Sequence, residues 1–377
     1  MNRSVIVMPS YNPDEHMITF LQALIAGGAR KIIIVNDGSE ADRLPYFEEA
    51  AAYPEVDLLT HEVNKGKGRA IKTAIAHYRS MGYENEFLGL ITADDDGQHA
   101  PADVQKMADA LAELYSSSGA STQTATDNDK NDDRHPDRTI ILGVRDFGEN
   151  VPFRSRIGNT LTRKLFHLFY GVPVQDTQTG LRAIPNELLE FCENVRGERY
   201  EYEMNVLTES ALHKIALKQL GIATIYIDKN SASRFHVVRD SWKIYKVLFG
   251  RFFKYALSSL SSCLIDVGLF QLFIMLLKDK VGPYILTATV LARIVSSFYN
   301  YSMNRKVVFG TGNVKKTIFR YYLLAVCQML VSAGLVTGAK LLLPVLPESL
   351  IKVVVDTLLF FISYRIQQNF IFTEKHA

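Results

Sequence analysis

The sequence predicts an α/β domain with a mostly parallel sheet, followed by an all-α domain of four transmembrane helices. In the front half, short β-branched runs alternate with stretches of helical periodicity, which is typical of parallel strands covered by helices. The back half contains four apolar segments long enough to span a bilayer. The chain has 377 residues, more than one hydrophobic core usually accommodates, and this length favours two domains.

The elements of the front half follow one another in regular order. Strands are predicted at residues 4–8, 31–35, 56–61 and 87–93, and helices at 15–26, 44–52 and 68–81. In sheets of this kind, ligands collect at the carboxyl ends of the strands. Polar clusters follow three of these strands, at residues 9–13, 36–39 and 94–96. We therefore expect the three clusters to meet at one edge of the sheet.

The cluster after the fourth strand is strongly acidic. The apolar run Phe87–Ile91 leads into Thr-Ala-Asp-Asp-Asp-Gly-Gln-His at residues 92–99. A buried strand that ends in three carboxylates brings negative charge to a sheet edge, where a divalent cation can neutralise it. Acidic triplets are also common on solvated loops, so the assignment of a metal site depends on the surrounding motifs.

Composition narrows the classes of function. A formal net charge of +2 is too small to indicate a nucleic-acid partner. The cysteines Cys192, Cys263 and Cys327 are far apart, which fits a reduced protein without a disulfide framework. The N-terminus runs directly into a short strand-like segment rather than a long apolar signal core. We therefore expect the front half to remain in the cytosol.

A basic, glycine-rich turn precedes the third predicted helix. In Asn64-Lys-Gly-Lys-Gly68, glycine permits backbone conformations in which exposed N–H groups face an anion. The segment is not a P-loop, because the spacing G-x-x-x-x-G-K-[ST] is absent. An anion-binding turn and an ordinary basic turn are both compatible with these residues.

Eight short motifs occur in a fixed order over about the first 245 residues. They are Pro9-Ser-Tyr-Asn12, Val35-Asn-Asp-Gly-Ser39, Asn64–Gly68 with Ala70, Asp94–His99, Gly143-Val-Arg145, Asp176–Ala183, Glu201–Met204 and Arg239-Asp-Ser241. Any one motif is weak evidence, but the ordered set is specific. On these motifs, the front half resembles the family 2 glycosyltransferases of the Rossmann-like GT-A fold, in particular the dolichyl- and polyprenyl-phosphate sugar synthases.

The resemblance implies a metal site and a donor pocket. Mg²⁺ or Mn²⁺ would be held against the donor diphosphate by Asp94, Asp96 and Gln98, of which the two aspartates also count as catalytic. The pocket for the nucleotide-sugar would be formed by Pro9, Tyr11, Asn12, Asp37, Lys67 and Asp95. Taken alone, Asp37 fits a simple turn and Tyr11 a packed aromatic ring; the neighbouring acidic cluster favours the binding roles.

The implied chemistry requires cations more than a general base. A bound divalent metal stabilises the leaving diphosphate as its charge builds. An acceptor phosphate monoester, with a second pKa near ~6, is largely dianionic at neutral pH and is already a nucleophile. The resemblance implies that Arg145, which is also expected to be catalytic, binds this phosphate together with Arg154, Arg156 and Arg182. Arg154 and Arg156 also fit a basic turn before a helix predicted over 157–169.

The implied reaction transfers a hexose from a nucleotide-sugar to a polyprenyl phosphate with inversion at the anomeric carbon. GDP-mannose and UDP-glucose remain open as donors, and dolichol and undecaprenol as acceptor lipids; a homo-oligomer is compatible with the sequence. A flippase or membrane scaffold with a non-catalytic transferase-like domain is the alternative, and the intact acidic cluster argues against it. A processive polysaccharide synthase is disfavoured, because the only tryptophan, Trp242, does not stand in a Gln-x-x-Arg-Trp motif.

The back half is predicted to cross the membrane four times, at residues 255–277, 284–303, 321–343 and 346–365. Asp266 and Arg293 would lie within the first two spans, and we expect them to form an ion pair there, because unpaired charges in a bilayer are costly. Residues 301–309 echo residues 364–372, which indicates two related helical hairpins. This half resembles the GtrA-like membrane domain.

Domain limits and topology complete the expectations. We predict a transferase domain at residues 1–234 with a mobile loop at 116–138, an interfacial helix at 235–252 and the membrane domain at 253–377. The segment 235–252 also fits the extended start of the first span. Lys and Arg are concentrated between the second and third spans, which places this loop, the transferase domain and both termini in the cytoplasm.

Overall fold

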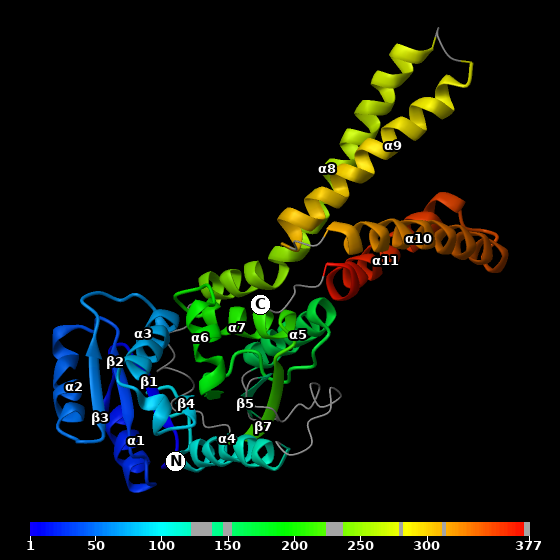
Figure 1. Cartoon of the computed structure of the whole chain (residues 1–377). Helices are drawn as coiled ribbons and strands as arrows, with labels where there is room; N and C mark the ends of the chain where they lie inside the picture. The colour runs from blue at the N-terminus through cyan, green and yellow to red at the C-terminus, as the bar shows by residue number, and fades with distance from the viewer. Residues whose placement is uncertain (122–137, 146–152, 224–236, 279–281, 311–313, 373–377) are drawn as a thin grey trace. The chain divides into compact units, whose positions relative to one another are not determined.

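The computed structural model describes residues 1–121, 138–145, 153–223, 237–278, 282–310 and 314–372 (Figure 1). The chain divides into two compact units, Met1–Leu248 and Phe249–Ala377. The first unit carries a seven-stranded sheet and the second contains helices. Of the predicted mobile loop at 116–138, residues 116–121 are the end of helix α4 and residues 122–137 lie outside the described part of the chain.

The sheet of the first unit is mixed but mostly parallel, as predicted. Its strand order is β3-β2-β1-β4-β6-β5-β7. Strand β6 runs antiparallel to both of its neighbours, β4 and β5, and the other described pairings are parallel. The strands are β1 Val5–Ser10, β2 Ile32–Asn36, β3 Val56–Thr60, β4 Gly89–Thr92, β5 Thr139–Arg145, β6 Arg182–Pro185 and β7 Ala216–Ile222.

Helices connect the strands on both sides of the sheet, and the first three predicted helices occur within one residue of their expected limits. Asp14 caps the first of them by accepting a hydrogen bond from the backbone N–H of His16. The helices of this unit are α1 Glu15–Ala26, α2 Leu44–Ala51, α3 Lys67–Ser80, α4 Pro101–Ser121, α5 Phe153–Tyr170, α6 Leu189–Asn194 and α7 Glu201–Leu212.

The main core lies between one face of the sheet and helices α1, α2 and α4. Ile6 and Met8 of β1, with Ile32 and Ile34 of β2, belong to this core. The alternate residues of the same strands, such as Val7, are equally buried but point to the other face. Both faces of these strands are therefore covered, which explains their nearly continuous apolar sequences.

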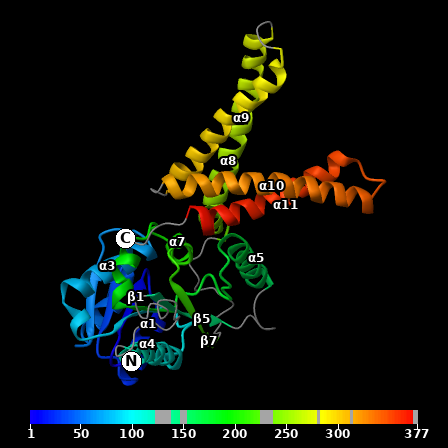
Figure 2. The ribbon, with the colours of Figure 1, turned by 45° about the vertical axis from the view of Figure 1, so that its right-hand side comes forward.

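The second unit consists of helices that pair into hairpins, α8 with α9 and α10 with α11 (Figures 1 and 2). Their bounds are α8 Val237–Leu277, α9 Tyr284–Met303, α10 Val314–Leu342 and α11 Glu348–Ile366. The residues of α8 up to Leu248 belong to the first unit. Two segments, Trp242–Leu277 and Thr317–Leu342, are long and apolar enough to cross a membrane. Large apolar side chains such as Leu264, Leu330 and Leu358 point outward, which suits contact with lipid. Four spans remain a prediction.

The predicted internal repeat has a structural counterpart. Each hairpin ends in a short π-helix, Asn304–Val308 after α9 and Gln367–Ile371 after α11. The amide of Asn304 donates a hydrogen bond to the side-chain carbonyl of Gln367, and the rings of Phe309 and Phe372 stack with centroids 5.1 Å apart. The equivalent ends of the two hairpins therefore pack against each other.

The predicted ion pair inside the membrane domain is present. Nη2 of Arg293 in α9 lies 3.1 Å from Oδ2 of Asp266 in α8. The second oxygen, Oδ1 of Asp266, accepts a hydrogen bond of 2.6 Å from the hydroxyl of Ser296. The carboxylate therefore has a partner on each oxygen, as a charge within a membrane domain requires.

Candidate active site

The polar clusters that follow β2, β1 and β4 meet at one edge of the sheet, as predicted. These three strands are adjacent and parallel, so their carboxyl ends lie side by side. Across the edge, the hydroxyl of Ser10 donates a hydrogen bond of 2.5 Å to Oδ2 of Asp95. Both residues are buried, so Asp95 links β4 to β1 beneath the surface of the site.

Asn12 connects the first two of these loops. Its backbone has a φ of 51°, a left-handed conformation that asparagine tolerates better than most residues. Its backbone N–H donates to Oγ of Ser39 over 2.8 Å, and its side-chain carbonyl accepts from the backbone N–H of Glu40 over 2.8 Å. Pro9 is buried at the end of β1, and Tyr11 beside it is half-buried. The two Asn12 contacts join the loop after β1 to the loop after β2.

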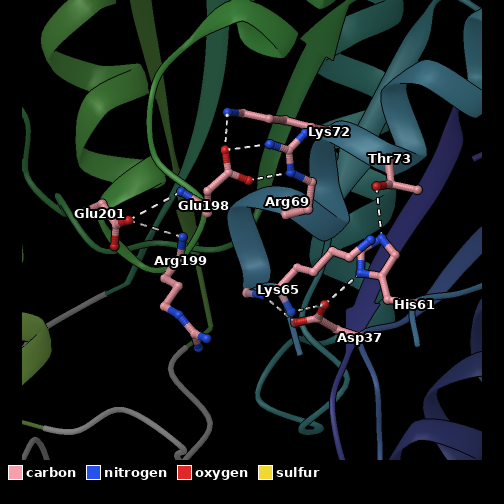
Figure 3. A network of polar contacts seen from close by, with 10 residues as sticks. Asp37, His61, Lys65, Arg69, Lys72, Thr73, Glu198, Arg199 and Glu201 are labelled. Atoms are coloured by element: carbon pink, nitrogen blue, oxygen red, sulfur yellow. Dashed lines mark hydrogen bonds and ion pairs between the residues drawn. The ribbon is translucent and has the colours of Figure 1, made fainter. Parts of the chain in front are cut away.

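Asp37 anchors the turn that leads into α3 (Figure 3). Its Oδ1 accepts from the backbone N–H of Lys65 over 2.9 Å, and its Oδ2 accepts from that of Gly66 over 2.7 Å. Nδ1 of His61 lies 2.7 Å from Oδ1 of Asp37, while Nε2 of the same ring lies 3.0 Å from the hydroxyl of Thr73. Asp37 is therefore held by protein groups, and its predicted contact with the nucleotide remains a prediction.

The turn places Lys67, the first residue of α3, against two carboxylates. Nζ of Lys67 lies 2.6 Å from Oδ1 of Asp94 and 2.7 Å from Oε1 of Glu203 in α7. Burial alone would raise the pKa of Asp94, but the ammonium of Lys67 and the imidazole of His99 together outweigh burial and hold that pKa below its usual value. Burial alone would lower the pKa of Lys67, but Asp94 and Glu203 hold it above its usual value. Lys67 therefore forms ion pairs with a carboxylate of the β4 loop and with one of α7.

Asp96 and Gln98 follow on the same loop. The backbone N–H of Gln98 donates to Oδ1 of Asp96 over 3.1 Å. Burial raises the pKa of Asp96, and the negative charge of Asp94 raises it further. Nε2 of His99 lies 3.6 Å from Oδ2 of Asp94, and within the described structure neither ring nitrogen of this buried residue has a hydrogen-bond partner. This loop therefore carries a carboxyl group with a raised pKa and a buried imidazole without a hydrogen-bond partner in the described structure.

A divalent cation such as Mg²⁺ requires oxygen ligands around it. Among the described residues, no group of three or more His, Cys, Asp or Glu side chains is arranged to hold a metal ion. Mg²⁺, however, is commonly bound by only one or two carboxylates, with substrate phosphates and water completing its shell. Two carboxylates, an amide and a buried imidazole without a hydrogen-bond partner fit such a cation.

Space for the Asp94 carboxylate depends on Gly180. A Cβ atom added to Gly180 would overlap the carboxylate of Asp94. The carbonyl of Gly180 also accepts a hydrogen bond of 2.6 Å from the hydroxyl of Thr92, the last residue of β4. The loop 176–181 therefore packs directly on the end of β4 and determines where Asp94 can lie.

The arginines predicted to bind the acceptor phosphate occupy different environments. Arg145 makes two contacts with the fully buried carboxylate of Asp176, as Nε lies 2.7 Å from Oδ2 and Nη2 lies 3.1 Å from Oδ1. Arg182 is buried and donates to the carbonyls of Thr179 and Glu203, whereas its Nη2 has no hydrogen-bond partner among the described residues. Arg154 and Arg156 belong to the first turn of α5, and their side chains lie outside the described structure.

The identity of the two units is decided by comparison with protein families. A family model described as "Glycosyl transferase family 2" matches residues 5–172, and one described as "GtrA/DPMS, transmembrane domain" matches residues 254–372. The chain joins a family 2 glycosyltransferase domain to a GtrA/DPMS transmembrane domain. The GT-A resemblance and the GtrA-like resemblance drawn from the sequence are both confirmed.

Similar proteins include two with assigned names. The UDP-N-acetylglucosamine–dolichyl-phosphate N-acetylglucosaminyltransferase of Methanococcus voltae is 26% identical over 257 residues, which cover 64% of this chain and 94% of the relative. The dolichyl-phosphate beta-glucosyltransferase of Saccharomyces cerevisiae is 25% identical over 262 residues, covering 64% of this chain and 72% of the relative. The crystal structure of S. aureus TarS is 12% identical with a TM-score of 0.36, over 80% of this chain and 50% of that chain.

Two contacts at the candidate site were not predicted from the sequence. Glu203 was part of a recognised motif, yet nothing in its spacing indicated that it meets Lys67, because the two are 136 positions apart. His61 ends a predicted strand, and only the structure shows it beside Asp37. The roles of all the named site residues remain predictions.

Proposed function

We propose that this chain transfers a sugar from a nucleotide-sugar to a polyprenyl phosphate at the cytoplasmic face of a membrane. The observation that carries the proposal is the meeting of Asp94, Asp96 and Lys67 at the sheet edge of a family 2 glycosyltransferase domain. The same chain carries a GtrA/DPMS transmembrane domain, which suits a lipid-linked acceptor. The named relatives act on dolichyl phosphate and support this choice of acceptor.

The donor would bind with its diphosphate over the β4 loop. A divalent metal held by Asp94, Asp96 and Gln98 would supply positive charge to the leaving diphosphate. Lys67 would add a second positive charge on the α3 side of the same loop, and its ammonium already lies between two carboxylates. Pro9, Tyr11, Asn12, Asp37 and Asp95 would form or support the nucleoside pocket at the ends of β1 and β2.

The acceptor phosphate would bind beside Arg145. The two-point pair with Asp176 fixes the orientation of the guanidinium that would meet this phosphate. Arg154, Arg156 and Arg182 are proposed to complete the positive surroundings of this phosphate. The dianionic phosphate attacks the anomeric carbon directly, so a single displacement with inversion is expected.

Three nucleotide-sugars are candidate donors. GDP-mannose and UDP-glucose were the candidates from sequence, and the two named relatives use glucosyl and N-acetylglucosaminyl groups. UDP-N-acetylglucosamine is therefore a third candidate. The proposed topology has four spans, with the catalytic domain and both termini in the cytoplasm. The proposed limits of the domains are 1–234, 235–252 and 253–377.

The test is transfer of labelled sugar to polyprenyl phosphate by membranes that contain the full chain. Each of the three donors is incubated with and without EDTA, and the anomeric configuration of any lipid product is determined. We expect one donor to be used, EDTA to abolish transfer and Asp96→Asn to reduce it at least a hundredfold. Asp42→Asn, which changes an exposed carboxylate, is the matched control. Transfer by none of these donors, or undiminished transfer by Asp96→Asn, would refute the proposal.

A further inference from the structure

The position of Lys67 is fixed by contacts made on both sides of it. Gly66 precedes it with a φ of 105°, and a Cβ at Gly66 would overlap the side chain of Arg199 and the carbonyl of Glu198. Asp37 accepts hydrogen bonds from the two backbone N–H groups before Lys67. The backbone that carries the Lys67 side chain is therefore held in place.

A second set of contacts ties α3 to the segment before α7 (Figure 3). The carboxylate of Glu198 pairs with Arg69, whose Nη2 lies 2.8 Å away, and with Lys72 at 3.5 Å. Arg199 donates to the side-chain carbonyl of Asn64 over 2.9 Å. These contacts hold the start of α7, and hence Glu203, at a constant distance from Lys67.

Of the two carboxylate partners of Lys67, only one is a predicted metal ligand. Asp94 belongs to the predicted metal site, whereas Glu203 comes from α7 and is not among the predicted ligands. Two carboxylates therefore face one ammonium, and Asp96 follows Asp94 by two residues on the same loop. A cation that binds Asp94 competes directly with Lys67 for the same carboxylate.

We propose that Lys67 is an exchangeable counter-ion of Asp94 and that Glu203 is the positioning residue that retains it. Without a divalent cation, Lys67 neutralises Asp94. When the cation engages Asp94, the ammonium keeps its pair with Glu203, because a buried ammonium left without any partner would be strongly destabilising. It thereby stays beside the donor diphosphate rather than moving away. The inference rests on the metal-dependent transfer proposed above.

Mn²⁺ affinity tests this inference separately from sugar transfer. The full chain in detergent is titrated with Mn²⁺, and free Mn²⁺ is measured by electron paramagnetic resonance. Lys67→Met removes the competing positive charge, so we expect Mn²⁺ to bind about tenfold more tightly. Glu203→Gln removes one of the two carboxylate partners of Lys67 and leaves its ammonium paired with Asp94. We therefore expect this variant to bind Mn²⁺ about tenfold more weakly. Glu209→Gln removes the same charge from α7 away from Lys67 and should stay within twofold of the wild type.

The double variant Lys67→Met with Glu203→Gln shows whether Glu203 affects Mn²⁺ binding through Lys67 or only through its own negative charge. If Glu203 acts by retaining Lys67, Glu203→Gln changes Mn²⁺ affinity less than threefold in the Lys67→Met background. Equal effects of Glu203→Gln in both backgrounds, or an unchanged or weaker affinity in Lys67→Met, would overturn the inference. If Lys67→Met does not fold, Lys67→Gln replaces it, because its amide can still hydrogen-bond to a carboxylate.

The same titration distinguishes this inference from the proposed function. Tighter Mn²⁺ binding in Lys67→Met and weaker binding in Glu203→Gln, in a protein that transfers no sugar, would support the counter-ion exchange and refute the proposed reaction. Transfer that depends on the metal, with Mn²⁺ affinity insensitive to both substitutions, would support the reaction and refute the exchange. Wild-type protein that binds no Mn²⁺ above the level of Asp96→Asn would refute the exchange and the metal dependence together.

Discussion

The guanidinium of Arg145 and the carboxylate of Asp176 form a two-point pair between the end of β5 and the loop before β6. The contacts measure 2.7 Å and 3.1 Å, and the carboxylate is completely buried. Oδ1 of Asp176 also accepts from the backbone N–H of Gln178 over 3.0 Å. A buried carboxylate with these partners fixes the direction of the guanidinium more firmly than a surface ion pair would.

We expect Asp176→Asn to raise the KM for polyprenyl phosphate about tenfold while the KM for the donor changes less than twofold. The amide cannot accept both guanidinium contacts, so Arg145 loses its fixed orientation toward the acceptor. We also expect a loss of stability of about 1.5–3 kcal/mol, because hydrogen bonds to a charged group are weakened. Steady-state kinetics in detergent and a thermal melt measure the two effects. An increase confined to the donor KM would contradict the acceptor role of Arg145.

Gly180→Ala tests whether the position of the Asp94 carboxylate governs metal binding. The added methyl group would overlap this carboxylate and force it or the loop to move. We expect Mn²⁺ affinity to fall about tenfold, equivalent to ~1.4 kcal/mol, with a further ~1–3 kcal/mol lost from stability. Gly221→Ala is the matched control, because a Cβ there would meet no atom within 4 Å. Wild-type affinity in Gly180→Ala would mean that Asp94 does not bind the metal.

Asp57 on β3 gives the front domain a specific dependence on pH. Burial alone would raise its pKa, but hydrogen bonds from Tyr83, His77 and Lys31 outweigh burial and lower it. A carboxylate with a lowered folded-state pKa contributes stability above its unfolded pKa of about 3.9, and this contribution is lost as the pH falls through the folded value.

We therefore expect Asp57→Asn to lower the melting temperature at pH 7 and the difference from the wild type to narrow as the pH falls below about 4.5. A loss of about 1.5–3 kcal/mol at pH 7 is typical of hydrogen bonds to a charged group. The exposed substitution Asp42→Asn should show no comparable change. A difference that grew on acidification would contradict the lowered pKa.

The pair of Asp266 and Arg293 is expected to stabilise the membrane domain through a direct interaction. Asp266→Asn and Arg293→Gln should each destabilise the chain by about 1–2 kcal/mol, within the range measured for polar contacts between membrane helices. The double variant should lose less than the sum of the two. Thermal melts of the detergent-solubilised chain provide the three values. Strict additivity would show that the two side chains act independently despite their separation of 3.1 Å.

Much of the front domain could be predicted because its signals are local. The alternation of apolar runs with amphipathic helices sets the element order, and parallel strands necessarily bring their carboxyl ends to one edge. The convergence of residues 9–13, 36–39 and 94–96 followed from that rule alone. The reversed direction of β6 did not, because a strand of four residues carries no sequence mark of its direction.

The division between sequence and tertiary structure is clearest at Lys67. The sequence alone determined the domain order, the fold class, the acidic loop after β4 and the apolar helices of the back half, since each depends on neighbouring residues and on hydrophobic periodicity. Only the tertiary structure decided that Lys67 bridges Asp94 and Glu203, that Asp37 anchors the turn before α3 and that Asp176 orients Arg145. Charged side chains from distant segments are paired by packing, and the cost of burying a charge alone selects the partner that the fold brings within reach.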